Sequence, residues 1–244
     1  MRAAILPDRA VLRVNGDDAR HFLQNLITSD IEKLATGEAR FAALLTPQGK
    51  ILFDFFVIAH DNGFLLDAPK ALAADLAKRL RFYKLRASVE IEETDFTVAV
   101  GFDGQQKPHF DIAFADPRHA RLGLRIVLPS SEAEQFLRAA GLTLTDASEW
   151  QSRRITLGIP EGGKDFVYGD AFPHEADMDQ LSGVDFKKGC FIGQEVVSRM
   201  QHKTAVRTRV VPVAFDGNRP EEGAEVKIGE KAAGFFGSSA DGRG

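Results

Sequence analysis

The chain has 244 residues, of which 44% are hydrophobic and 27% charged, and its formal net charge is −4. This composition is typical of a globular protein and excludes one built wholly to coat nucleic acid. No apolar run approaches the roughly 18–20 residues of a membrane-spanning helix, and the short run at residues 1–7 does not resemble a signal peptide. The single cysteine permits no internal disulfide, so we expect a reducing, cytoplasmic compartment.

The first part of the chain alternates between strand and helix patterns. Asp17 is placed to cap a first helix, and Pro69 suits the first position of a second one. The order is strand, helix, strand, strand, helix, strand, with one short extra strand, which is the split βαβ, ferredoxin-like pattern. The predicted strands lie at residues 10–14, 39–46, 50–59, 64–67 and 87–92.

Residues 96–140 have the pattern of a second, degraded copy of the same unit. Its first helix is replaced by the loop at residues 103–107, and a helix is predicted at 131–140. We expect the two copies to form antiparallel sheets that are shared or abut. The predicted strands of this copy lie at residues 96–102, 109–114 and 122–128.

The last hundred residues contain a helix pattern at 146–158, a long loop rich in turn formers at 159–186, and one or two helical turns at 194–200. An all-β pattern follows, with too few strands to close a barrel. The predicted class is therefore α+β, with an α+β domain at 1–204 in two halves (about 1–94 and 95–204) and an incomplete β-barrel at 205–244. The strands predicted for this barrel lie at residues 206–215, 224–228 and 231–237.

The only cysteine, Cys190, lies between two lysines and a Gly-Gln-Glu turn. A neighbouring ammonium group favours the thiolate over the thiol, so this setting indicates a reactive cysteine. The alternative is a small buried hydrophobic residue, which is what most isolated cysteines are. The residues of this motif are Lys188, Gly189, Cys190, Phe191, Gly193, Gln194 and Glu195.

The sequence of this motif resembles the signature of the YgfZ family of folate-binding proteins, which is similar to the T-protein (aminomethyltransferase) of the glycine cleavage system. The resemblance covers roughly residues 5–240 and implies duplicated ferredoxin-like units that bind folate, followed by a small β-barrel. It also implies a role in assembly or maintenance of iron–sulfur clusters, with effects on tRNA methylthiolation. Further similar segments are Phe22-Leu23-Gln24, Thr46-Pro47-Gln48-Gly49-Lys50, Tyr83-Lys84-Leu85-Arg86 and the stretch from Arg154 to Pro160.

The resemblance also implies site residues. Cys190 is the expected functional, catalytic thiol, and Trp150 falls where the second of two folate-site tryptophans is expected, with Arg9 near the position of the first. Arg154 is a candidate bidentate partner for the folate carboxylate, with an exposed helix arginine as the alternative. Thr156 falls where the T-protein carries a folate-contacting glutamate, which counts against aminomethyl transfer, and no counterpart of its catalytic aspartate is recognised.

The other charged residues of the motif have two readings each. Lys188 either raises the thiolate character of Cys190 or binds an anion, with a solvated surface lysine as the alternative; Glu195 caps the cysteine loop or pairs with Lys188. From residue 187 to 209 there are six Lys or Arg and one acid, which suits a folate polyglutamate tail or RNA phosphates. The histidines show no metal-ligand spacing, so we expect no stably bound metal.

We therefore predict a folate-binding accessory protein of iron–sulfur cluster assembly, with tetrahydrofolate or another folate as cofactor. Its partners are iron–sulfur assembly proteins or cluster enzymes, with no membrane contact. It is not expected to be a stand-alone enzyme. The alternatives are a tetrahydrofolate-dependent aminomethyl or one-carbon transferase that uses the same pocket, and a tRNA-binding module.

Overall fold

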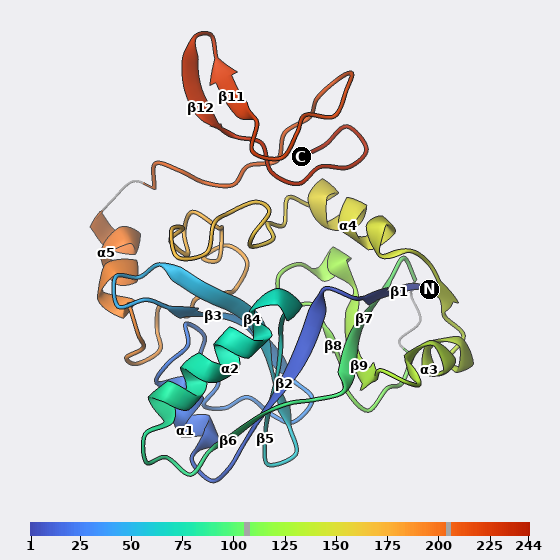
Figure 1. The fold of residues 1–244 in the computed structure, drawn as a ribbon, viewed down its shortest axis with the longest axis vertical. Helices are drawn as coiled ribbons and strands as arrows, with labels where there is room; N and C mark the ends of the chain where they lie inside the picture. Colours follow the sequence, from blue (N-terminus) through green and yellow to red (C-terminus); the bar gives the residue numbers. More distant parts are fainter. Residues whose placement is uncertain (105–107, 204–205) are drawn as a thin grey trace.

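The computed structural model describes residues 1–104, 108–203 and 206–244, and its architecture is two antiparallel-rich sheets packed face to face with helices on their outer faces (Figure 1). The predicted α+β class is confirmed. The first sheet has the order β3-β4-β5-β2-β6. Its strands are β2 (Arg9–Asn15), β3 (Ala39–Leu45), β4 (Ile51–His60), β5 (Gly63–Pro69) and β6 (Glu90–Glu93).

Strand β4 shows why the sequence of this sheet is so continuously apolar. Alternate residues of a strand point to opposite faces. Phe53 and Phe55 belong to the outer core cluster under the helices, while Phe56 and Ile58 belong to the inner core cluster between the two sheets. Because both faces are buried, the strand reads as a hydrophobic run instead of an alternation.

Two helices, α1 (Ala19–Gln24) and α2 (Lys70–Lys84), cover the outer face of the first sheet. In α2, the predicted face residues Leu76 and Leu80 are buried together with Ala73 and Ala77, whereas the predicted Leu72 and Tyr83 are only partly buried. Helix α1 is shorter than its periodicity suggests, because Leu26 and Ile27 are buried in the turns that follow it. The predicted cap is also wrong: the N-cap residue is Asp18, whose carboxylate accepts a hydrogen bond from the backbone of Ser88.

The second sheet has the order β10-β1-β7-β9-β8, with α3 (Ala133–Ala139) on its outer face. The strand β1 (Arg2–Leu6) was not recognised in the sequence, yet it pairs antiparallel with β7 and parallel with β10. The N-terminal strand therefore completes the sheet of the second half. The other strands of this sheet are β7 (Phe96–Phe102), β8 (Ala113–Ala115), β9 (Leu124–Pro129) and β10 (Thr143–Leu144), with the short 3-10 turn η1 (Ala120–Leu122) before β9.

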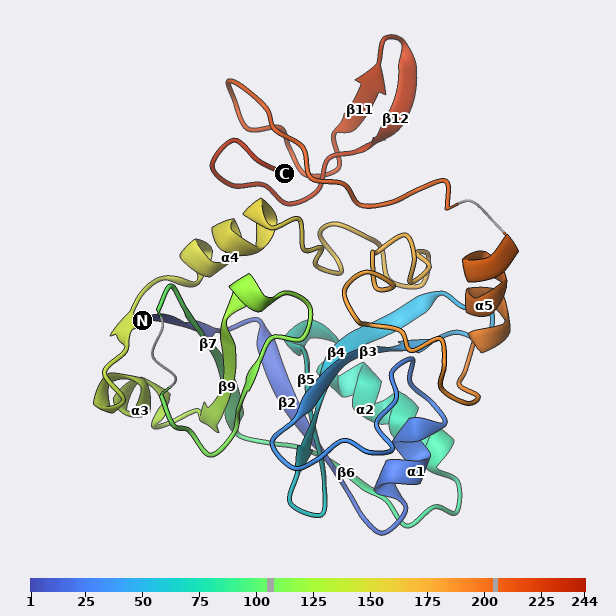
Figure 2. The same cartoon turned by 180° about the vertical axis from the view of Figure 1, so that it is seen from behind.

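The long loop of residues 159–186 joins α4 (Ala147–Thr156) to the segment before α5 (Gln194–Lys203), and it lies over the β3–β4 hairpin in both views (Figures 1 and 2). Backbone hydrogen bonds attach it to the first residue of β4: Ile51 N–H donates to Ala171 O (2.9 Å) and Gly169 N–H to Ile51 O (2.7 Å). The loop is therefore an ordered wall of the fold, as predicted.

Over the described residues 206–244, the C-terminal segment forms one hairpin, β11 (Glu225–Ile228) with β12 (Lys231–Phe235), at the top of Figure 1. The strand predicted at residues 206–215 is wrong: Ala214 makes a single isolated bridge with Arg243. The predicted domain boundary at residues 204/205 and most of the loop at 103–107 lie outside the described residues.

Candidate functional site

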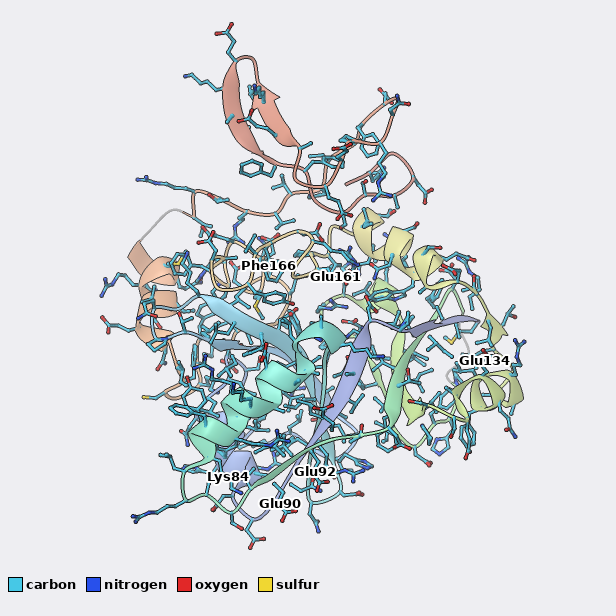
Figure 3. The ribbon with its side chains drawn as sticks, in the orientation of Figure 1. Lys84, Glu90, Glu92, Glu134, Glu161 and Phe166 are labelled. Carbon is cyan, nitrogen blue, oxygen red and sulfur yellow. The ribbon has the colours of Figure 1, made fainter. Side chains whose placement is uncertain are left out.

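A narrow cavity of about 40 Å³ lies between the two sheets, under α4 and the long loop. Its walls come from several separate stretches of chain, which the packing of the sheets brings together. Figure 3 labels Glu161, one of its lining residues, in the loop that follows α4. The lining residues used below are Arg9, Asp54, Phe56, Arg118, Arg125, Trp150, Arg154, Glu161 and Tyr168.

A chain of paired charges forms the floor of this cavity. Asp67, fully buried in β5, accepts hydrogen bonds from Arg9 Nε (2.6 Å) and from Arg125 Nε (2.8 Å). Asp116 accepts from Arg118 Nε (3.0 Å) and lies 3.6 Å from Arg125. Because unpaired buried charges are very costly, each carboxylate here stands between two guanidinium groups.

The pKa values of this network follow from burial and charge acting in opposite directions. Burial raises the pKa of Asp67, but the charges of Arg125 and Arg9 outweigh it, so the pKa lies below its ordinary value. Burial lowers the pKa of Arg125, although Asp67 opposes the shift. The Arg125 guanidinium also lies 4.2 Å from the ring centre of Phe56, where the aromatic face stabilises its charge.

Trp150 and Glu161 give the cavity unused hydrogen-bonding capacity. Trp150 is only 4% exposed, and its indole Nε1 has no hydrogen-bond partner among the described residues; the same holds for Glu161 Oε2, which has only an ion-pair contact with Arg154 Nε (3.2 Å). Buried polar atoms are normally paired, so these two atoms fit a ligand that offers an acceptor and a donor. Trp150 is thus a core residue that also faces the cavity.

Tyr168 and Asp54 form a hydrogen-bonded pair on the wall opposite α4, with the phenol donating to Asp54 Oδ1. Burial, and then the Asp54 carboxylate, raise the pKa of Tyr168, so it stays a donor. The pair joins the long loop to β4 and places a carboxylate in the cavity.

Arg154 was expected either to bind the folate carboxylate or to be an exposed helix arginine, and the structure shows a different, structural arrangement. It is 2% exposed and binds within the protein: Nε donates to Gln151 Oε1 (2.7 Å), one terminal nitrogen to Asp165 (2.9 Å) and the other to Ser238 Oγ (2.8 Å). It also donates to Ile159 O. The guanidinium therefore holds α4, the long loop and the C-terminal segment together.

Arg9 and Thr156 also change the folate-site expectations. Arg9 does line the cavity, but its guanidinium is held by Asp67. Thr156 is exposed and lines a separate surface hollow beside Arg2 and Arg153. Thr156 supplies no carboxylate, but the cavity still contains two, those of Asp54 and Glu161.

In the segment that carries Cys190, one lysine, Lys188, is buried and its neighbour Lys187 is exposed. Lys188 is 7% exposed, and its ammonium donates to the carbonyls of Gln24 (2.7 Å), Ile27 (2.7 Å) and Ser29 (3.0 Å) after α1. Burial lowers its pKa to about 8, with Asp30 and Asp185 opposing the shift. Its burial rules out the alternative of a solvated surface lysine, and the three carbonyls give Lys188 a structural role in place of the predicted anion contact. Its effect on the thiolate character of Cys190 stays a prediction. Lys187, in contrast, is exposed.

Cys190 itself is exposed, which excludes the buried-hydrophobe alternative. The next residues hold the segment in place: Phe191 belongs to the inner core cluster and Ile192 packs on the outer one. Gly193 has φ +81°, and a Cβ there would lie 2.7 Å from Thr46 O in the β3–β4 turn. Only glycine permits this approach, so two of the motifs recognised in the sequence contact each other.

The remaining charges of the motif do not gather around the thiol. Glu195 is exposed and pairs with Arg199 (2.7 Å), not with Lys188. Arg209 donates to Asp177 (2.7 Å) and Asp179 (2.7 Å) of the long loop. With Lys188 buried as well, the run from 187 to 209 does not present six free cations, which removes the main observation for direct RNA binding. Gln194 is half-buried at the start of α5.

Sequence reasoning did not find Asp54, Asp67, Arg125, Glu161 or Tyr168. A signal was available for two of them: Asp54 and Asp67 are the acidic residues inside otherwise apolar strands. A charge in such a strand must find a partner or a solvent-filled site.

The described residues contain no group of three His, Cys, Asp or Glu side chains arranged to hold a metal. Across the same residues, no helix is both long and apolar enough to cross a membrane.

Comparisons with known proteins agree with this fold. Residues 9–101 match the family model of the GCVT N-terminal domain, and residues 207–244 match that of the CAF17 C-terminal β-barrel domain. The crystal structure of the glycine cleavage system aminomethyltransferase T from Bartonella henselae superposes with a TM-score of 0.77 at 19% identity, over 98% of this chain and 74% of that one. The duplicated fold with a small C-terminal barrel domain, which the resemblance implied, is thus confirmed.

The chain is also similar in sequence to iron–sulfur cluster assembly factors named IBA57. The chain is 34% identical over 232 residues to the mitochondrial iron–sulfur cluster assembly factor IBA57 homolog of Mycosarcoma maydis, over 88% of this chain and 57% of that protein. It is 32% identical over 243 residues to mitochondrial IBA57 of Homo sapiens, over 89% of this chain and 67% of that protein. The chain thus spans little more than half the length of the fungal relative. The predicted cytoplasmic location is wrong by this comparison, since a lone cysteine indicates a reducing compartment without saying which one.

Proposed function

Since the chain belongs to the IBA57 family of iron–sulfur cluster assembly factors, we propose that it assists cluster assembly by presenting one thiolate, that of Cys190, to a partner protein. The observation that carries the proposal is the exposure of Cys190 on a segment anchored on both sides. Lys188 and Phe191 are buried on either side of it. The thiol is thus held in a fixed position outside the fold.

A single thiolate limits what the protein does. Common clusters are held by four cysteine thiolates, and this chain has one cysteine. Cys190 therefore supplies one ligand to a cluster whose other ligands belong to the partner, and loses its thiol proton to solvent on binding. The cluster is cargo that passes between proteins. Cluster-dependent enzymes, including those of tRNA methylthiolation, are the recipients we propose.

We propose further that the cavity between the sheets binds a folate such as tetrahydrofolate. The lining chemistry supports this, because Trp150 Nε1 and Glu161 Oε2 are buried without hydrogen-bond partners and Asp54 adds a second carboxylate. A folate supplies a carrier for one-carbon groups; here Trp150 would stack or donate and Glu161 would accept. A cavity of about 40 Å³ holds little more than water, so the residues of the long loop at 160–162 must move outward on binding.

The thiol is tested by Cys190→Ser in cells that lack the native protein. Because the side chain is exposed, we expect the free energy of unfolding to stay within about 0.5 kcal/mol of wild type, while the activity of cluster-dependent enzymes falls to the level of the deletion. Ser198→Ala in α5 is the control for a general effect of substitution in this region. Full activity with Cys190→Ser contradicts the role of the thiol.

The folate is tested separately by titrating the purified protein with tetrahydrofolate while following fluorescence. Trp150 is the only tryptophan, so the signal reports on this cavity alone. We expect quenching, and its loss in Glu161→Leu, which removes the acceptor, at the same folate concentration. No quenching and no heat of binding would remove the folate from the proposal and leave the thiol in place.

A further inference from the structure

The second half of α2 and its C-terminal end form a basic and apolar surface, here called the α2 patch. No acidic residue occurs from 76 to 89, although the chain as a whole is acidic. Figure 3 labels Lys84 at this end of α2, on the outside of the molecule. The patch consists of Lys78, Arg79, Arg81, Phe82, Lys84, Leu85 and Arg86.

Its two hydrophobic side chains are among the most exposed in the protein. Phe82 is 71% exposed and Leu85 88%. They are not left over from core packing, because Leu76 and Leu80 fill the buried face of the same helix. Lys78 and Phe82 are four residues apart, so they lie together on the outward face.

The cations of the patch are not neutralised by the fold. Among the described residues, none of the five takes part in an ion pair; Arg81 donates to the backbone carbonyl of Ile91 (2.8 Å). Elsewhere in the protein arginines such as Arg125 and Arg209 are paired with carboxylates. The patch therefore presents unused positive charge beside exposed apolar surface.

The backbone conformation of Leu85 is an independent observation. It is the C-cap of α2 with φ +47° and ψ −106°, a conformation that glycine adopts readily and other residues adopt with strain of about 1–3 kcal/mol. A leucine here is unfavourable twice, through strain and through exposure. Because the side chain is 88% exposed, packing against the described residues offsets little of either cost, which indicates that the side chain is used outside the chain.

We propose that the α2 patch is a docking surface for a partner protein that presents carboxylates around an apolar pocket. Phe82 and Leu85 enter the pocket, and the cations pair with the carboxylates at its rim. Exposed apolar anchors surrounded by charge are the usual organisation of a protein interface.

The neighbouring strand favours a protein over a membrane or RNA. Strand β6 borders the patch through the contact of Arg81 with Ile91, and its Glu90, Glu92 and Glu93 are exposed. Figure 3 shows Glu90 and Glu92 on the same side of the molecule as Lys84. An extended anionic surface would meet these acids as well as the cations, whereas a compact partner contacts the cations alone.

The docking surface lies outside the cysteine segment and the cavity, so it goes beyond the proposed function. Its test begins with the photo-crosslinking residue p-benzoylphenylalanine at position 82 of the full chain in cells. The captured protein is then purified and titrated with wild type and variants. We expect Leu85→Gly and the pair Lys78→Glu with Arg86→Glu to weaken binding about tenfold or more, which is about 1.4 kcal/mol or more.

Two features separate docking from a structural role. Leu85→Gly relieves the backbone strain, so it should stabilise the fold in urea unfolding while it weakens binding. Phe136→Ser, an exposed phenylalanine of α3, and Lys70→Glu, at the other end of α2, are matched controls that should leave binding unchanged.

The proposal is overturned if the captured protein binds Leu85→Gly as tightly as wild type, or if no protein is captured at position 82. It is also overturned if tRNA, or vesicles of equal parts phosphatidylcholine and phosphatidylglycerol, bind in a patch-dependent way instead. Cys190→Ser should not affect binding, so failure of the thiol proposal and failure of this one are distinguishable.

Discussion

In the cavity between the sheets, charged side chains point inward and pair with one another, whereas around Cys190 they are divided between one buried lysine and exposed neighbours. Asp67 and Arg125 are held by each other, and Lys188 is held by three backbone carbonyls. Charge pairing therefore holds the floor of the cavity in place, and backbone anchoring holds the cysteine segment. The difference shows that residue type alone does not reveal whether a charge serves a ligand or the fold.

The largest expected effect is the loss of one partner in the buried network. Asp67→Ala leaves Arg9 and Arg125 buried without their shared carboxylate. Breaking a buried pair on one side costs about 3–5 kcal/mol, so we expect urea unfolding to show a loss of this size. Asp17→Ala, at an exposed position with no side-chain hydrogen bond or ion pair among the described residues, is the control and should change stability by less than about 0.5 kcal/mol. A loss under about 1 kcal/mol for Asp67→Ala would mean that the network relaxes freely.

The next effect compares two glycines of the cysteine motif. Gly193→Ala places a methyl group 2.7 Å from Thr46 O at φ +81°, whereas a Cβ on Gly189 meets nothing within 4 Å. We expect about 1–3 kcal/mol of destabilisation for the first and less than about 0.5 kcal/mol for the second. The measurement is chemical unfolding of both variants. Equal effects at the two positions would show that the close approach to the β3–β4 turn does not anchor the segment.

The smallest effect is a pH dependence that belongs to Lys188 alone. Its pKa is about 8 in the folded protein and 10.5 ordinarily, so the unfolded chain binds more protons between these values. The contribution of Lys188 to stability should therefore be lowest and constant below about pH 8, and should rise as pH increases from about 8 to about 10.5. Wild type and Lys188→Met are compared by urea unfolding across this window, with Lys187→Met as the exposed control. A difference between wild type and Lys188→Met that stays constant with pH would contradict the depressed pKa.

Local patterns predicted most of the α+β region. The periodicity of α2 and the apolar runs of β4 and β7 fix their structure within a few residues, because each buries its own regular face. The strand predicted at 206–215 is wrong because its pairing among the described residues is limited to the bridge of Ala214 with Arg243 and the backbone hydrogen bonds beside it, and Pro212 has no backbone N–H to donate. Alternation of apolar and polar residues predicts a strand only where a neighbouring strand can pair with it.

The candidate site was harder to predict because its residues depend on long-range packing. Lys187 and Lys188 are adjacent and chemically identical, yet one is exposed and the other buried. Arg154 was recognised, but its partners Asp165 and Ser238 come from the loop and the C-terminal segment. The functional role of Cys190 stays a prediction; the structure shows that its side chain is exposed, which a sequence motif alone does not reveal.

Strand β1 has a consequence for the order of folding. Ile5 pairs with Ala99 in the second sheet, while β3, β4 and β5 of the first sheet are joined by short turns. Closing a long loop costs entropy before any contact is gained, so pairings between distant segments form slowly. We expect the hairpins of the first sheet to form early. The second sheet should form later, because β7 must pair with β1, which lies more than ninety residues earlier in the chain. Partly folded molecules would then expose the edge of β7, a strand prone to pairing with other chains until β1 covers it.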